Sequence, residues 1–263
     1  GKVPEVAAVI KKVGRVLNRF WGRKRWSRMK LREVAEKNHK KKIGLYRAKL
    51  TRFAGKVREM ARMLRLKADL QEVAISAEYG AHKWNLTVKE KEALAADEEA
   101  EEETDDGEDA IKKILFDEPG FWKPLVEALK VMTPIVKLLR LMDGEKPAMG
   151  KVYDRMCIIG AKMEERDFSW KAKAIKIHSD RWEYIHSPMH AAGYALDPEH
   201  MAMVDLDEAT QTGLMLIIER VCLRDLKAAA VTEADADALT MANDAVQTRV
   251  ASTMVELATF QQR

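Results

Sequence analysis

Apolar residues recur every three to four positions along most of this 263-residue chain. That spacing places them on one face of an α-helix. Helix formers dominate the composition, while glycine and proline contribute only 13 and 7 residues. The sequence therefore predicts a mainly α fold and argues against a β-sandwich or β-barrel. The expected helices span residues 4–20, 27–40, 51–77, 121–141, 149–163, 168–186, 189–196, 207–229 and 232–260.

Local signals refine three of these helices. Ser27 and Thr51 are expected to cap the helices that they precede. Pro134 lies inside the helix expected over 121–141 and should kink or interrupt it. Between the second and third helices the sequence leaves room for at most a short strand near residues 45–50.

The charges are distributed unevenly along the chain. The first 73 residues contain 23 Lys and Arg against 6 Asp and Glu, whereas the remaining 190 contain 23 against 36. Ten of the thirteen residues from Asp97 to Asp109 are acidic. Such a run has almost nothing to bury and repels itself, so a solvated loop or linker is expected there. We therefore divide the chain into a basic helical segment (1–80), an acidic linker or loop (81–118) and a second helical domain (119–263).

Several classes of protein are disfavoured. Cys157 and Cys222 are far apart, which argues against a disulfide framework or a cysteine-based zinc site. No apolar stretch is long enough for a membrane span, and the first residues lack a signal-peptide pattern. Phosphate-loop, dinucleotide-binding and nucleophile-elbow motifs are missing, and no small-molecule substrate is expected. The chain begins without an initiator Met, so we expect a fragment of a longer polypeptide.

The histidines offer one enzymatic alternative. His178, Asp180, His186 and His190 lie within thirteen residues, and the i,i+4 pair His186 and His190 could hold zinc. Pro188 between them argues against one continuous helical turn, so packing and capping roles are favoured over a metal site. No metal or catalytic residue is assigned on this basis.

The basic front of the chain points to an anionic partner. Lys and Arg neutralise phosphates, and Trp21, Trp26 and Tyr46, which lie among them, could stack on bases or flank a groove for the phosphate backbone. Nucleic-acid binding is favoured over a merely solvated basic surface. A helical scaffold that binds proteins remains the alternative, and the acidic run could compete for the basic front.

Six strings follow one another along about residues 45–200. They are Leu50-Thr51-Arg52-Phe53-Ala54, Gly120-Phe121-Trp122-Lys123-Pro124-Leu125, Thr133 to Gly144, Lys146-Pro147-Ala148-Met149-Gly150-Lys151-Val152-Tyr153, Asp180-Arg181-Trp182, and His190 to Pro198. In this order they resemble the hAT family of DNA transposases. In that family a T-R-[WF] segment is followed by a helical insertion with the pattern FW…P…LR..D…P.MG..Y, then RW, then HAA…L.P.

The resemblance implies an RNase H-like core interrupted by a helical insertion domain. Enzymes of this family cut and join DNA with two divalent ions, Mg or Mn, held by three acidic residues. No counterpart of those acids is found here, so this chain alone is not expected to be catalytic and no cofactor is assigned to it. Asp143, Asp180 and Asp197 are expected to cap helices and turns.

The expected partner is DNA, with nuclear localisation; a homo-oligomer is left open, and no membrane partner is expected. The resemblance places Arg52 against phosphate and Phe53 against a base or the core. The full set of expected DNA-binding residues is Arg23, Lys24, Arg25, Arg28, Lys41, Lys42, Arg47, Lys49, Arg52 and Phe53.

Overall fold

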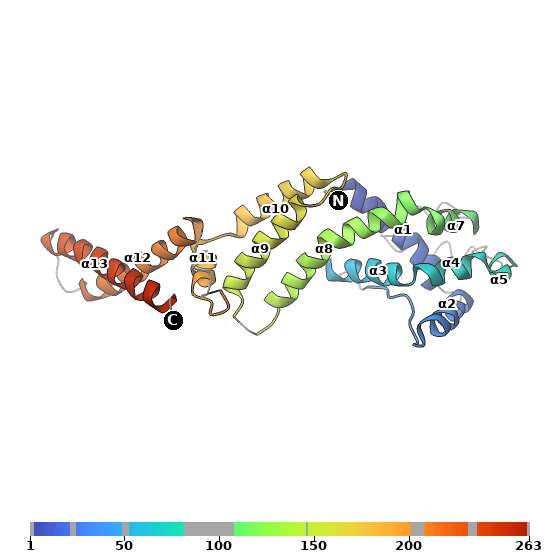
Figure 1. Cartoon of the computed structure of the whole chain (residues 1–263), viewed down its shortest axis with the longest axis horizontal. Helices are drawn as coiled ribbons and strands as arrows, with labels where there is room; N and C mark the ends of the chain where they lie inside the picture. The colour runs from blue at the N-terminus through green and yellow to red at the C-terminus, as the bar shows by residue number, and fades with distance from the viewer. Residues whose placement is uncertain are drawn as a thin grey trace, which may run out of the picture. The chain divides into compact units, whose positions relative to one another are not determined.

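The computed structural model describes residues 3–21, 25–48, 53–81, 108–145, 147–200, 208–230 and 236–261 (Figure 1). In these ranges every regular element is helical, and the chain divides into two compact units, residues 1–136 and 137–263. The expected mainly α fold is therefore confirmed. The division after Val136 lies inside a helix, whereas the sequence placed a boundary at residue 119. Within the described residues, no helix is long and apolar enough to cross a bilayer.

The first unit contains seven complete helices among its described residues. Their bounds are α1 (Pro4–Trp21), α2 (Arg25–His39), α3 (Phe53–Arg65), α4 (Lys67–Ile75), α5 (Ala77–Ala81), α7 (Glu108–Phe116) and the π-helix η1 (Glu118–Trp122). Helix α8 (Lys123–Met142) begins in this unit and ends in the second. It runs through Pro134 without the interruption that the sequence allowed for.

Helix α1 packs against α2, α3 and α7, and α4 packs against α2, α3, α5 and α7. The apolar stripe of α1 explains this arrangement, since Val13, Val16 and Phe20 are all buried. The largest buried side chains from the surrounding elements are Leu31, Met60, Met63, Leu66, Leu70, Tyr79, Ile111, Leu115, Phe121 and Trp122.

Two expectations for this unit are wrong. The helix expected over 51–77 is broken at Leu66 and at Ser76, which separate α3, α4 and α5. Leu66 is fully buried and has φ −98° and ψ 17°, so tertiary packing and not a breaker residue ends α3. Ser27 does not cap α2. It lies inside that helix, and its hydroxyl donates to the Arg19 carbonyl in the last turn of α1 at 3.1 Å.

The turn from α7 into η1 is fixed by polar contacts with α1. Asp117 caps η1, its Oδ1 accepting from the Gly120 N–H at 2.7 Å. Lys12 of α1 reaches Asp117 Oδ2 at 3.3 Å and the Gly120 carbonyl at 2.8 Å. The Gly120 N–H and the Lys12 ammonium lower the pKa of Asp117. Helix α7 falls inside residues 81–118, the stretch expected as linker or loop, and it contributes Ile111 and Leu115 to the core.

The second unit contains α9 (Met149–Glu164), α10 (Lys171–Ile185), α11 (Pro188–Ala195), α12 (Glu208–Ala230) and α13 (Ala236–Gln261). Helix α9 packs against α10 and α11, α11 against α12, and α12 against α13. Small residues make these contacts close: a Cβ on Gly213 of α12 would lie 2.6 Å from the Ala191 Cβ of α11. Val246 and Val250 of α13 are buried against Met215 and Ile218 of α12.

Candidate nucleic-acid interface

The segment that joins α2 to α3 is the best-defined basic feature of the first unit. Helix α2 ends where Lys40 takes a left-handed conformation, with φ 51°. Residues 42–48 then run without helix or strand, so the short strand expected near residues 45–50 is not found in the described part of that range. Ile43 and Leu45 are buried, whereas Lys42 and Arg47 are exposed. This burial of alternate residues is typical of an extended chain lying on a core.

Side chains of α3 hold this segment in place. The Ala48 N–H donates to Glu59 Oε1 at 2.6 Å, and Arg62 donates to the Gly44 carbonyl at 3.0 Å. Glu59 is only 2% exposed and also lies 3.6 Å from the Lys56 ammonium. The two backbone contacts and the two buried side chains therefore fix the backbone from which Lys42 and Arg47 extend.

Five cations of this region form what we call the loop cations: Arg32 of α2, Lys41, Lys42 and Arg47 of the segment, and Arg58 of α3. All five are exposed, and none forms an ion pair with an acidic residue in the described ranges. The side chain of Arg32 lies over Gly44, since a Cβ built there would be 3.3 Å from Arg32 Nε. The Arg58 guanidinium lies over the Tyr46 ring, 4.8 Å from its centroid.

Other cations of the first unit are used inside the fold. Lys12 pairs with Asp117, Lys67 with Glu118, and Lys30 with Glu78. The Glu78 carboxylate raises the pKa of Lys30. The loop cations differ from these residues because, among the described residues, they have no acidic partner. A cluster of Arg and Lys is suited to bind a phosphate backbone.

The expected DNA-binding residues fall into four groups. Lys41, Lys42 and Arg47 lie together on the loop, while Arg28 is half-buried on α2 with its guanidinium 5.7 Å from the Trp21 ring. Arg25 and Phe53 are described only as the first residues of α2 and α3. The remaining four lie outside the described residues: Arg23, Lys24, Lys49 and Arg52.

Sequence reasoning missed Arg32 and Arg58. Both belong to helices, and each is followed in the sequence by a glutamate and does not stand in a run of cations. A usable signal was present, since Arg58 and Arg62 are four residues apart and must share one face of α3. The sequence could not show that the segment after α2 crosses this face of α3.

In the second unit, His190 caps a helix and His178 packs against a neighbouring helix. His190 is the third residue of α11, and its Nδ1 accepts from the Ser187 N–H at 3.2 Å in a capping box. The ring of His178 packs on Gly160, and burial lowers its pKa. In the part of the chain that the structure describes, no group of three or more His, Cys, Asp or Glu side chains could hold a metal ion.

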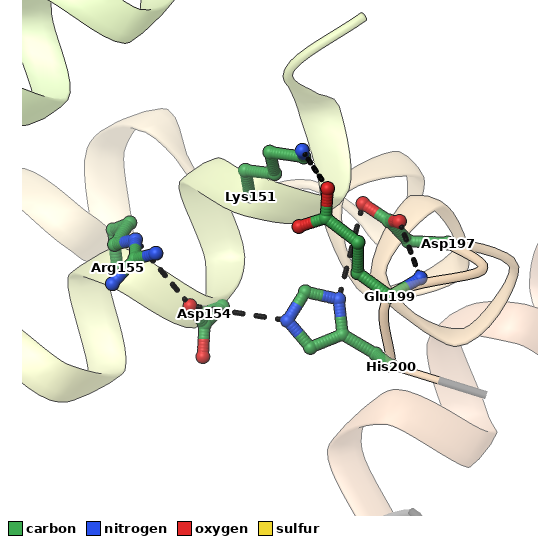
Figure 2. Close-up of polar contacts among 6 residues, drawn as sticks. All are labelled: Lys151, Asp154, Arg155, Asp197, Glu199 and His200. Carbon is green, nitrogen blue, oxygen red and sulfur yellow. Dashed lines mark hydrogen bonds and ion pairs between the residues drawn. The ribbon is translucent and has the colours of Figure 1, made fainter. Parts of the chain in front are cut away.

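A further group of polar contacts is centred on His200. Figure 2 shows it between Asp154 of α9 and Asp197 of the turn after α11, with N···O distances of 3.9 and 3.8 Å. Lys151 of α9 pairs with Glu199 of the same turn at 2.6 Å, which raises the Lys151 pKa. Asp197 Oδ1 accepts from the Glu199 N–H at 3.0 Å, so this aspartate organises a turn as the sequence predicted. These contacts fasten the turn to α9.

Comparison with protein-family models, with proteins of known function and with solved structures gives no match for this chain.

Proposed function

We propose that this chain is a DNA-binding fragment of an hAT-type cut-and-paste transposase, or of a domesticated relative, and that the loop cations bind the DNA. The observation that carries the DNA-binding proposal is a set of exposed cations without ion pairs to described acids. They lie on the segment that Glu59 and Arg62 hold, and on the two helices beside it. Because the backbone of the segment is already held, binding of phosphates does not require the segment itself to become ordered.

Support for the family comes from the quoted strings and from how some of them meet in the second unit. Gly150 and Tyr153 belong to one string, Trp182 to another, and Gly193 and Tyr194 to a third. The Tyr153 ring lies 5.8 Å from Trp182 and 5.2 Å from Tyr194, and Gly150 contacts Gly193. Strings up to about forty residues apart in the sequence therefore form one packed cluster.

The remaining parts of the proposal follow from the resemblance. The chain would act in the nucleus and contribute to a DNA channel. Strand cleavage with Mg or Mn is proposed only for a longer protein that also supplies the three acidic ligands. None of the residues named above is proposed as a catalytic residue.

The test is DNA binding measured by fluorescence anisotropy on a labelled duplex. We expect sub-micromolar to micromolar affinity that falls about 100-fold between about 50 and 200 mM salt, as release of counterions from about four phosphates requires. The triple variant Lys41→Ala, Lys42→Ala, Arg47→Ala should bind more weakly, and the slope of log affinity against log salt should decrease by about 2 to 3.

A matched control removes the same charge elsewhere. Lys162, Lys173 and Lys176 of the second unit are exposed and form no ion pair with a described acid. Their triple alanine variant should keep the wild-type salt dependence. Equal weakening in both triple variants would mean that net charge, and not the loop, attracts the DNA. Binding that stays flat from low to moderate salt would contradict the proposal.

A helical protein-interaction scaffold without nucleic-acid chemistry is the second candidate. It is favoured by exposed apolar side chains around the α10–α11 junction, where Tyr184 is 80%, Ile185 41% and Met189 48% exposed. Size-exclusion chromatography with and without DNA separates the two candidates. A shift in elution only when duplex DNA is present supports DNA binding, whereas self-association that ignores DNA supports the scaffold.

A further inference from the structure

The aromatic side chains among the basic residues show how the loop cations would contact a nucleic acid. Proteins that bind single strands stack bases on aromatic rings, so Trp21, Trp26 and Tyr46 were the candidates for such stacking. Trp26 does not serve this purpose. Its ring packs against Tyr79 at 6.4 Å, and Tyr79 is fully buried and stacks on Phe20 at 6.0 Å. Trp26 therefore belongs to the core of the first unit.

The other two rings each lie beneath an arginine. The Arg28 guanidinium is 5.7 Å from the Trp21 centroid, and the Arg58 guanidinium is 4.8 Å from the Tyr46 centroid. Both distances are within the range of a cation–π contact. A base that stacked on the same face of either ring would have to displace the arginine. Both rings are also partly buried, which limits what remains accessible.

Arg58 is the more accessible of the two arginines, since it is exposed and Arg28 is half-buried. In the described ranges Arg58 has no ion pair with an acid. The neighbouring carboxylate, Glu59, is buried and already contacts the Ala48 N–H and the Lys56 ammonium. A guanidinium that rests on an aromatic ring keeps its N–H groups at its edge, where they can donate two parallel hydrogen bonds to one phosphate.

We propose that Arg58, oriented by Tyr46, is a phosphate-binding residue, and that the loop cations bind double-stranded DNA through its sugar–phosphate backbone without stacking on bases. This inference rests on the proposed function and adds to it the mode of binding and a residue that the sequence did not indicate. Contacts to the backbone position a protein on DNA but do not read its sequence. The surface should therefore bind duplexes of unrelated sequence with similar affinity.

The experiment compares Arg58→Ala, Tyr46→Leu and the conservative control Tyr46→Phe on a short duplex and on oligothymidylate of equal length. At about 0.1 M salt, Arg58→Ala should bind the duplex about five- to tenfold more weakly, and its salt slope should decrease by about 1. Tyr46→Leu should weaken duplex binding about two- to fivefold through loss of the cation–π contact, and Tyr46→Phe should behave as wild type. Two duplexes of different sequence should bind within about twofold of each other.

Three outcomes would overturn the inference. If Arg58→Ala keeps the wild-type affinity and slope while the Lys41, Lys42 and Arg47 variant weakens, the proposed function stands and Arg58 is not a contact. If oligothymidylate binds more tightly than the duplex, and Tyr46→Leu but not Tyr46→Phe abolishes that binding, the ring stacks on bases. If the wild-type protein binds neither, the inference and the proposed function both fail. The thermal midpoint of Arg58→Ala should fall by no more than a few degrees, because an exposed cation–π contact contributes only about 0.5–1 kcal/mol.

Discussion

Gly150 of α9 lies so close to Gly193 of α11 that a Cβ on Gly150 would be 2.4 Å from the Gly193 carbonyl oxygen. No side chain can be accommodated at that distance unless the two helices separate. This contact joins two of the strings that resemble the hAT family, and it lies in the helix pair to which the turn with Asp197 and His200 is fastened.

Gly150→Ala should therefore destabilise the second unit by about 1–3 kcal/mol, since the added methyl group overpacks a backbone contact. The matched control is Gly14→Ala in α1, where a Cβ would meet nothing within 4 Å. That change should be neutral or stabilise by up to about 1 kcal/mol through helix propensity. Urea unfolding followed by circular dichroism measures both. Equal stability of the two variants would contradict the glycine contact.

The second unit should lose stability in mild acid. Burial lowers the pKa of His178 and of His190 from the ordinary value of 6.5, and the His186 charge lowers that of His190 further. The unfolded chain therefore takes up protons near pH 6.5, while the folded chain does so only at lower pH. Stability should be complete above about pH 6.5 and decline below it, by at most about 1.4 kcal/mol per pH unit for each histidine.

Urea unfolding between about pH 5 and 7.5 measures this decline, and His178→Asn should make it shallower because asparagine does not titrate. A wild-type urea midpoint that is equal at both ends of the range would show that neither histidine is buried as described.

Lys40→Gly should stabilise the first unit by about 1 kcal/mol. Lys40 has φ 51°, a conformation that glycine adopts without strain and lysine does not. Lys41→Gly is the control, because it removes the same charge from the next residue, for which the structure records no positive φ. Chemical denaturation should rank Lys40→Gly above wild type and Lys41→Gly at or below it. If Lys41→Gly were instead the more stable variant, the left-handed residue that ends α2 would not be Lys40.

Glu59→Ala should destabilise the first unit by about 1–3 kcal/mol, because the Ala48 N–H would lose its acceptor in a part-buried position. Glu59→Gln should lose less, since the amide oxygen can still accept that hydrogen bond. Glu36→Ala removes the same charge from an exposed position of α2 and should change stability by less than about 0.5 kcal/mol. Thermal unfolding of the three variants measures these changes in stability. Equal effects of Glu59→Ala and Glu36→Ala would contradict the stabilising role of the hydrogen bond from the Ala48 N–H to Glu59.

The helical repeat was enough to predict most elements, because their apolar stripes become the buried faces of α1, α9 and α11. It failed at Leu66, where neither glycine nor proline marks the break and the packing of a buried leucine decides. Runs of adjacent lysines indicated Lys41 and Lys42 as binding candidates, and both side chains are exposed. The sequence could not show that Lys12 forms an ion pair with Asp117, because the two residues are 105 positions apart.

The pairing of α1 with α7 has a consequence for how the first unit is made. Part of the apolar faces of α1 and α4 is covered by Ile111, Leu115 and Trp122. During translation these faces therefore stay partly exposed until the ribosome has passed residues 82–107 and added those side chains. Once folded, the same contacts join the two sides of that stretch. A chain cleaved between residues 82 and 107 should therefore elute as one particle, and separately expressed halves of the unit should reassemble.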